Sequence, residues 1–523
     1  MATKQDSTQF YREAGAASRY STLEQDRETY LQRAVNNAKL TIPMLFPDKN
    51  DTATTEYETP YQSIGARGVN NLCAKLMKAL FPPNEPFFRL QLGTEIQEEV
   101  DAQQANTVKL DEVLAMMERR IMNYMETERF RITLSEAVLQ LLVAGNVLLY
   151  VPPEGGGIKM YRLSNYVVVR DGLGNWIEVV VKERAAYAAL PDEARACIKD
   201  TQPNPDTSYD LYTHVYLKDN ETYAMYQELE GEIINGSEAE FPKDKVPWMP
   251  LRLRKMDNES YGRSYVDEYY GDLKTLNALS KAVTEMAAIA SFVLFLVNPS
   301  STLRIDKLKD AQSGDFFKGK EGDITAFQLN KLNDLNIVVP QIQDLQSRLS
   351  FAFLINSAVQ RQAERVTAEE IRYVASELED TVGSIYSLLS VELQRPLVSC
   401  VMAQVMRNGS IPDMEIGAYG IEAKIVTGVE ALGRGYDLSK MEQLLQVTQL
   451  LPSGTQRLKE GNILTAAASS IGLDGSQFVK SDEELQAELM QAQQMALEQQ
   501  VAAPVADNLT QPTQPTQQQQ VQQ

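Results

Sequence analysis

Residues 264–297 read SYVDEYYGDLKTLNALSKAVTEMAAIASFVLFLV, and this stretch decides the fold. Apolar or small residues recur along it in alternating steps of three and four, at Leu273, Leu276, Ser280, Val283, Ala287, Ala290, Leu294 and Val297. The spacing predicts one helix over residues 264–297, on the order of 50 Å long at about 1.5 Å of rise per residue. The C-terminal half of this helix is apolar on nearly every face, so neighbours must bury it all round. One chain does not obviously supply those neighbours, whereas a ring of identical chains would.

The chain then makes a small cap and returns along a second helix. Asn298-Pro299 is expected to end the first helix, and residues 298–340 form a compact polar insert in which six basic and six acidic side chains cancel. A second helix is predicted over residues 341–356, because apolar residues repeat there at helical spacing. The side chains expected to pack the two helices are Leu273, Leu276, Val283, Ala287, Ala290, Leu294, Leu345, Leu349 and Phe353.

The segments before this helix pair predict helices followed by a β-rich region. Helical periodicity covers residues 21–40, 63–81, 107–124 and 134–143. From Val147 the apolar period changes to two, which favours strands at residues 147–151, 158–163, 166–170, 176–182, 209–217, 222–229 and 249–256. The predicted fold class is therefore α+β and mainly helical.

The segments after the pair favour a polar link and further helices. Residues 357–366 carry two arginines and are too polar to be core. Thr367 and Glu370 form a capping-box pattern that opens a third long helix, which Pro396 kinks or ends. Residues 411–427 are mixed and could include a strand. Beyond them the sequence predicts helices at residues 438–451, 458–471 and 481–501, and a disordered Pro-, Thr- and Gln-rich tail at residues 502–523.

Composition and charge exclude several function classes. Fifty basic against seventy-one acidic side chains give a net charge of −21, so a sequence-specific DNA binder is not expected. The three cysteines lie far apart without metal-ligand spacing, which predicts free thiols in a reducing compartment. The only histidine, His214, lies in an alternating run, so a sheet side chain is predicted there and not a catalytic base. The longest apolar run, residues 287–297, is shorter than the roughly 20 residues that span a bilayer, and no membrane insertion is expected.

One segment matches the phosphate-loop pattern in part. Residues 314–320, GDFFKGK, fit this pattern as far as Lys320. Glu321 then stands where the pattern needs Ser or Thr to hold magnesium, no apolar strand precedes the segment, and Gly322 follows where a helix should open. We interpret the match as a coincidence. No catalytic, cofactor-binding or metal-ligating residue is predicted, and no cofactor is expected.

Residues 348–353, RLSFAF, and above all residues 365–380, RVTAEEIRYVASELED, resemble the portal proteins, or head-to-tail connectors, of short-tailed, podovirus-type bacteriophages. Supporting stretches follow the family's order, at residues 65–68, 144–150, 259–265, 314–316 and 366–370. Matches of this length are far more specific than any short motif in the chain. The resemblance is weakest in the C-terminal helices and the tail.

The resemblance implies a phage portal fold in which wing, stem, clip and crown surround a central channel. The wing would comprise residues 1–263 and 367–436, the stem helices residues 264–297 and 341–356, the clip residues 298–340, the channel loop residues 357–366, the crown residues 437–501 and the disordered tail residues 502–523. The helix, cap and returning helix predicted from the residues alone agree with stem, clip and stem.

The resemblance also implies a function and partners. The family forms a closed homo-oligomeric ring, usually dodecameric, at the portal vertex of the virion, assembled in the host cytoplasm. Double-stranded DNA passes through the ring without sequence specificity during packaging and ejection. The implied protein partners are the terminase large subunit, scaffolding protein, major capsid protein, tail adaptor proteins and internal core proteins. Candidate DNA contacts in the channel loop are Arg361 and Arg365, and candidate docking residues in the clip are Lys307, Lys309, Lys318 and Lys320.

Two other function classes compete with this interpretation. A packaging motor or another nucleotide hydrolase needs a complete phosphate loop and a magnesium site, and the sequence shows neither. A tail adaptor is a structural alternative, but it would not need a paired long stem with a capped insert and a channel loop. The sequence leaves open the number of subunits, the stem face that lines the channel, and which clip residues contact the terminase or the tail.

Overall fold

The structure, a computed structural model, describes the chain in several ranges. The described residues are 7–47, 51, 54–83, 86–92, 107–199, 204–291, 294–300, 310, 312–316, 318, 320–327, 332–355, 383, 385–407 and 423–427, with positions 446, 463, 464 and 490. The expected channel loop with Arg361 and Arg365 lies outside the described residues. So do Lys307, Lys309, nearly all of the expected crown, and the tail.

The chain divides into two compact units. The first comprises residues 1–89, 118–420 and 425–429, and it contains nearly all of the described structure. In the second unit, the main described parts are the end of β1 (Phe88–Leu92), the first half of α5 (Thr107–Thr127) and the start of β13 (Ala423–Thr427). β13 lies within residues 411–427, the mixed region for which the sequence analysis allowed a strand.

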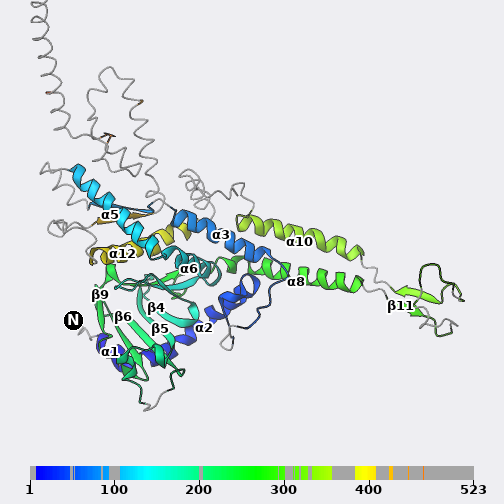
Figure 1. Cartoon of the computed structure of the whole chain (residues 1–523), viewed down its shortest axis with the longest axis horizontal. Coiled ribbons are helices and arrows are strands. Elements are labelled where there is room, and N and C mark those ends of the chain that lie inside the picture. Colours follow the sequence, from blue (N-terminus) through cyan, green and yellow to red (C-terminus); the bar gives the residue numbers. More distant parts are fainter. Residues whose placement is uncertain are drawn as a thin grey trace, which may run out of the picture. The chain divides into compact units, whose positions relative to one another are not determined.

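Helices form one part of the first unit (Figure 1). They are the second half of α5, α1 (Ser7–Ala14), α2 (Ala16–Leu40), α3 (Ile64–Leu80), α6 (Phe130–Ala144), the short α7 (Asp192–Arg195), α8 (Val266–Ser291), α10 (Leu332–Ala352) and α12 (Arg395–Arg407). The four helices predicted before the β-rich region are all present. α3 and α5 agree within a few residues, whereas α2 and α6 begin earlier than expected.

The described strands of the first unit form two antiparallel sheets and a separate strand pair. The larger sheet has the order β4-β5-β6-β7-β8, with β9 also pairing with β7, and the smaller has the order β10-β2-β3. The strands are β2 (Asn146–Tyr150), β3 (Lys159–Tyr161), β4 (Tyr166–Arg170), β5 (Trp176–Ala186), β6 (Ser208–Leu217), β7 (Thr222–Leu229), β8 (Glu232–Ile233), β9 (Ala239–Pro242) and β10 (Trp248–Arg252). All seven predicted strands are present, and β4 and β7 have the predicted bounds.

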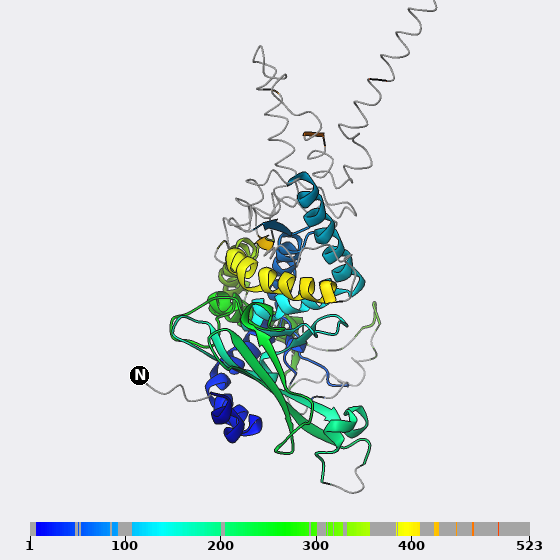
Figure 2. The same ribbon diagram turned by 90° about the vertical axis from the view of Figure 1, so that its left-hand side faces the viewer.

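Helix α2 covers one face of the larger sheet (Figure 2). The apolar cluster between them contains Ala16, Tyr20, Val167, Val180, Tyr216, Ala224 and Tyr226. Gly15 precedes the helix and has no side chain that could cap it. The carboxylate of Glu228 on β7 takes this role, accepting hydrogen bonds from the backbone N–H groups of Ala16 (2.5 Å) and Ala17 (3.2 Å).

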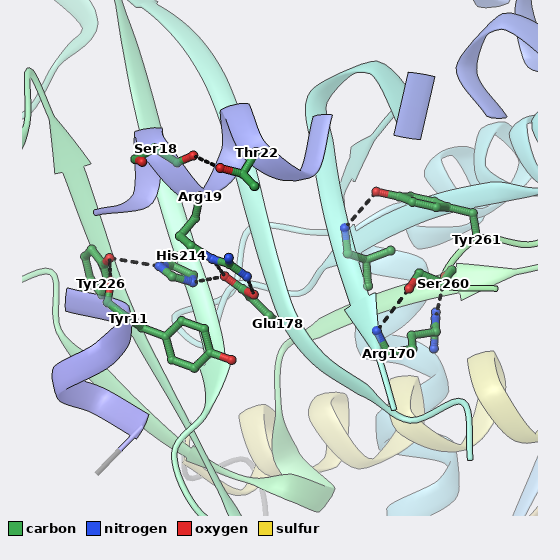
Figure 3. Close-up of polar contacts among 11 residues, drawn as sticks. Tyr11, Ser18, Arg19, Thr22, Arg170, Glu178, His214, Tyr226, Ser260 and Tyr261 are labelled. Atoms are coloured by element: carbon green, nitrogen blue, oxygen red, sulfur yellow. Dashed lines mark hydrogen bonds and ion pairs between the residues drawn. The ribbon is translucent and has the colours of Figure 1, made fainter. Parts of the chain in front are cut away.

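A buried polar network adds specific contacts to this interface (Figure 3). His214 Nε2 lies 2.9 Å from Glu178 Oε1, and His214 Nδ1 lies 2.9 Å from the Tyr226 hydroxyl. The same carboxylate accepts hydrogen bonds from Arg19 Nε (2.9 Å) and Nη2 (2.5 Å) of α2. The Tyr226 hydroxyl donates to the carbonyl oxygen of Tyr11 in α1 (3.1 Å). The prediction that His214 is a sheet side chain is confirmed, but the sequence did not indicate its partners.

The charge of Glu178 depends on this network. Burial alone would raise the pKa of this carboxyl group, because it penalises the charged form. The hydrogen bonds from His214 and Arg19 outweigh burial and hold the pKa of Glu178 below its usual value. In turn, the hydrogen bond to Glu178 raises the pKa of Arg19.

Helix α3 approaches the residues after α10 so closely that glycine is required. A Cβ added to Gly68 would lie 2.5 Å from Phe353 Cγ, and one added to Gly65 would lie 2.5 Å from a backbone carbonyl oxygen at the end of α2. Nearby, the Asn71 side-chain amide donates to the carbonyl oxygens of Phe353 (3.0 Å) and Leu354 (2.9 Å). The glycine pattern at residues 65–68 therefore serves close helix packing.

The predicted bounds of the helix pair are wrong in two respects. α8 ends at Ser291, and Leu294–Val297 form strand β11, which pairs with β12 (Ile324–Phe327). α10 begins at Leu332, nine residues before the predicted start, and ends at Ala352. Pro340 lies inside α10. A proline removes only one backbone hydrogen-bond donor, and this long helix continues past it. The insert between the helices is therefore shorter than residues 298–340.

The sequence predicted that Pro396 either kinks or ends the third long helix. It does not end the helix. A π-helical turn, Ser390–Gln394, comes directly before α12, which continues to Arg407. Proline cannot donate the backbone hydrogen bond of a regular helix, and the wider turn before it accommodates that loss.

We expect Glu178→Gln to lower the thermal unfolding midpoint at neutral pH by several degrees, because about 2–3 kcal/mol is typical when a buried charged hydrogen bond is lost. The folded pKa of Glu178 lies below its unfolded value. Its stabilising contribution is therefore complete above the ordinary glutamate pKa and is lost as the pH falls through the folded value. Scanning fluorimetry should show the gap between wild type and variant narrowing as the pH becomes acidic.

Glu240→Gln is the matched control, because Glu240 forms an exposed ion pair with Lys218 in the same sheet. Its loss should change stability by no more than about 1 kcal/mol. A Glu178→Gln midpoint equal to that of the control at every pH would contradict the stabilising role of the network.

We expect Gly68→Ala to destabilise the packing of α3 against Phe353, because the new methyl group would overlap the ring. Overpacking of this kind costs about 1–3 kcal/mol. The thermal midpoint should fall, and limited proteolysis should cut the α10 region faster. Gly271→Ala is the control, since a Cβ at Gly271 of α8 meets no atom within 4 Å. Equal or higher stability of Gly68→Ala would show that the close contact is not required.

Candidate functional site

The first turn of α8 is fixed by a buried hydrogen-bond cluster, here called the α8 cap. Ser264 and Asp267 cap each other: the Asp267 N–H donates to Ser264 Oγ (3.0 Å), and the Ser264 N–H donates to Asp267 Oδ2 (3.0 Å). From α2, the Asn37 amide nitrogen lies 3.0 Å from Ser264 Oγ, 2.7 Å from Asp267 Oδ1 and 3.1 Å from the carbonyl oxygen of Val143 in α6. The start of α8 is therefore bound to both α2 and α6.

The α8 cap was missed by the sequence predictions. The Ser-x-x-Asp spacing before an apolar periodic run is the signal that could have found its first half. No pattern around Asn37 distinguishes this residue from the exposed polar residues of the same helix. Its importance follows only from burial, since Asn37 is 2% exposed.

The proximal halves of α8 and α10 lie side by side and pack together (Figure 1). Leu273 and Leu276 of α8 are fully buried, as are Leu345 and Leu349 of α10 and Phe353 just after it. Five of the nine predicted packing residues are therefore buried in the described structure. Burying side chains of this size contributes about 1.5–3 kcal/mol each.

Two polar contacts reinforce the same interface. The Tyr265 hydroxyl donates to the carbonyl oxygen of Ala352 (2.7 Å), which fastens the start of α8 to the end of α10. Arg348 Nη1 lies 3.8 Å from Asp272 Oδ2, an ion pair between the two helices that is partly exposed. The hydroxyl contact is the stronger constraint, because exposed ion pairs contribute little.

The distal halves of both helices expose apolar side chains. Ile289 of α8 is 55% exposed, and Ile337 and Val339 of α10 are 75% and 41% exposed. Contiguous apolar surface on one chain usually marks a protein interface, and these three side chains can contribute to such a surface. The single chain therefore leaves this part of the helix pair uncovered.

Of the other four predicted packing residues, the structure describes the side chains of Val283 and Ala287. Val283 is half-buried and Ala287 is exposed. Leu294 belongs to strand β11 instead of α8. Ala290 lies in α8, but its side chain is outside the described residues.

The strand pair β11–β12 follows α8 and precedes α10 in the chain. Its antiparallel register runs from Leu294 opposite Phe327 to Val297 opposite Ile324. Phe295 and Leu296 are 66% and 57% exposed, so the pair also presents apolar side chains.

The segment that resembles a phosphate loop, residues 314–320, is followed by a strand. The Lys320 N–H donates to Asp323 Oδ2 (2.7 Å), and the Asp323 carbonyl oxygen accepts from the Asn298 N–H (2.9 Å). Strand β12 then begins at Ile324, where a phosphate loop requires a helix. Lys318 and Lys320, two of the four candidate docking residues, are exposed.

Within the described ranges, we find no three His, Cys, Asp or Glu side chains grouped closely enough to hold a metal ion. No described helix is both long and apolar enough to cross a membrane. The three cysteines are free, and burial raises the pKa of the Cys73 thiol to about 11 and that of Cys400 to about 12. Exposed apolar side chains make the surface formed by α8, α10, β11 and β12 the main candidate site, and it is suited to contacts with proteins.

The chain is similar to known viral proteins over most of its length. The family described as bacteriophage head to tail connecting protein matches residues 13–479. The portal protein of Escherichia phage T7 is 44% identical over 501 residues, covering 94% of this chain and 93% of the phage protein. The portal protein of Enterobacteria phage T3 is also 44% identical, over 500 residues, with the same two coverages.

A solved structure gives a weaker likeness. The neck of an empty GTA particle, computed with C6 symmetry, is 13% identical, covers 79% of this chain and 90% of its own, and has a TM-score of 0.36. A score this low does not bear on the fold, so the assignment depends on the sequence matches. They confirm the resemblance found in residues 348–353 and 365–380, and the chain belongs to the family of bacteriophage head-to-tail connecting proteins.

Proposed function

We propose that this chain is a portal protein: a closed ring of identical subunits, usually twelve in this family, at the portal vertex of a phage capsid. The observation that carries the proposal is the exposed apolar surface on the distal halves of α8 and α10. A second chain that repeats the same contact would cover this surface, and head-to-tail contacts between identical subunits form a ring when the rotation between neighbours closes. The similarity to portal proteins of T7 and T3 supports the same assembly.

The ring would be a channel for double-stranded DNA during packaging and ejection. DNA carries a negative charge about every 1.7 Å of its axis, so a strongly basic lining would grip it and slow it. Each subunit instead has a net charge of −21, which lets the duplex slide. Within residues 357–366, Arg361 and Arg365 would supply a few phosphate contacts at one constriction.

In the proposed layout the chain has the family's wing, stem, clip and crown, and the bounds of stem and clip follow the observed helices. α8 and α10 would be the stem, and the segment between them, including β11 and β12, would be the clip. The terminase large subunit would dock on the clip during packaging, and tail adaptor proteins would replace it afterwards. Exposed Phe295, Leu296, Lys318 and Lys320 offer apolar and basic contacts for such partners. Scaffolding, major capsid and internal core proteins would contact the wing and crown.

The proposed protein has no enzymatic activity of its own. The strand that follows Lys320 and the carboxylate of Glu321 are both unsuited to binding a nucleotide with magnesium. The energy for packaging would come from the terminase motor, which the ring would hold at the capsid.

The ring proposal predicts that the purified full-length chain has the mass of a multi-subunit ring with a central hole. The Ile289→Asp, Ile337→Asp double variant should shift the population toward monomers. Each substitution removes about 1.5–3 kcal/mol of apolar burial per interface, so half-assembly should need at least a tenfold higher concentration. Native mass spectrometry and negative-stain images give both readouts.

Leu173→Asp is the control for this test, because Leu173 is 77% exposed in the turn between β4 and β5. It should assemble like the wild type. A wild-type chain that remains a stable monomer or dimer in mild salt would exclude the ring.

The channel proposal predicts that Arg361→Ala, Arg365→Ala leaves ring assembly intact but weakens the retention of packaged DNA or slows the last stage of packaging. Phosphate contacts of this kind are individually modest and are screened by salt. An in vitro packaging assay with nuclease protection measures the effect. The paired variant Arg184→Ala, Arg407→Ala removes the same charge from exposed positions and should package normally. If the loop variant fails to form rings, these arginines have a structural role and the channel assignment is wrong.

A further inference from the structure

A cavity of about 350 Å³ lies between the larger sheet, strand β10 and helix α12, and the proposed ring function does not use it. Its lining includes Arg170, Trp176, Lys243, Trp248, Glu392 and Arg395. The π-helical turn that precedes α12 forms part of one wall. Such turns are uncommon inside helices and occur frequently at functional sites.

Half-buried Arg170, which lines the cavity, and buried Arg252, which lies behind the lining, have neutral hydrogen-bond acceptors. Arg170 donates to the carbonyl oxygens of Ser260 (3.0 Å), Gly174 (3.1 Å) and Pro250 (2.6 Å). Figure 3 shows Arg170 beside Ser260. Arg252 is 1% exposed and donates to the same Gly174 carbonyl oxygen (3.0 Å). Two guanidinium groups therefore converge on one backbone oxygen.

Among the described residues, neither Arg170 nor Arg252 forms the close ion pair that buried charges normally have, although Glu392 attracts both. Burial and the neighbouring Arg252 lower the pKa of Arg170 to about 10, against the attraction of Glu392. The Nε atom of Arg252 is buried without a hydrogen-bond partner among the described residues. Three cationic side chains, Arg170, Lys243 and Arg395, line the cavity against two carboxylates, Asp244 and Glu392, so its wall has a small excess of positive charge.

We propose that the cavity binds a small oxyanion of the phosphate or carboxylate class between Arg170 and Arg395. A guanidinium group has five N–H donors, and the carbonyl contacts use three of those on Arg170. The remaining donors and Arg395 would form charge-assisted hydrogen bonds with the anion. Trp176, stacked on Tyr223 with ring centroids 4.0 Å apart, supplies a flat apolar wall that limits access of water. A bound anion would link α12 to β10 and the larger sheet.

The test uses intrinsic fluorescence of the full-length protein. The chain has two tryptophans, Trp176 and Trp248, and both line this cavity, so their emission reports on it selectively. Sodium phosphate and sodium acetate are titrated separately, with sodium chloride added to hold ionic strength constant. A saturable change with phosphate alone assigns the phosphate class, one with acetate alone the carboxylate class, and one with both the shared oxyanion chemistry. No saturable change with either anion would overturn the proposal.

Two substitutions at the cavity should act in opposite directions. Arg395→Gln should weaken binding about tenfold, because it removes one charge-assisted contact. Glu392→Gln should tighten binding, because it removes a carboxylate that repels the anion. Arg407→Gln on the same helix makes the same charge change outside the cavity and should leave the dissociation constant unchanged. Equal weakening by Arg395→Gln and Arg407→Gln would indicate general charge screening and would refute a built site.

Discussion

The position of the helix pair depends on the α8 cap, in which Asn37 holds Ser264 and Asp267. The first N–H groups of any helix have no partner within that helix, and here they lie in buried surroundings where water cannot satisfy them. Leaving such a group unpaired costs about 1–3 kcal/mol. The reciprocal cap removes this penalty, and Asn37 fixes the cap to α2 and α6. The position of α10 is set in turn by α8, because the buried leucines and the Tyr265–Ala352 hydrogen bond attach the two helices to each other.

Much of the local structure could be predicted from the sequence, because local patterns determine it. β4 and β7 were predicted with their observed bounds, since their runs of apolar and β-favouring residues end at turn-forming residues on both sides. The end of α8 could not be predicted in the same way. Residues 292–297 are all apolar, so helical and strand periodicities fit them equally well. Pairing with β12 decides the outcome, and the sequence alone does not reveal that partner.

The functional residues also fall into those that local sequence patterns predict and those that depend on distant partners. The buried leucines of the proximal helix pair were visible as a periodic stripe, because packing requires residues at regular spacing. The polar groups that fix the geometry were not visible, because each needs one partner that is distant in the sequence. Asn37 and Asp267 are 230 residues apart, and His214 and Glu178 are 36 apart. Arg170 and Arg252 were likewise not distinguished from surface arginines until the shared carbonyl oxygen of Gly174 brought them together.

The acidic charge and the apolar helix surface have opposite effects on assembly. Identical subunits of charge −21 repel each other, and at physiological salt this repulsion extends over roughly 8 Å beyond the surface. The hydrophobic attraction acts only at contact and is proportional to the apolar area removed from water. Subunits can therefore associate stably only where apolar surfaces meet, and exposed Ile289, Ile337 and Val339 on the distal halves of α8 and α10 offer one such surface. The repulsion disfavours other contacts, so in the proposed assembly the balance of the two forces would favour an ordered ring over irregular aggregation.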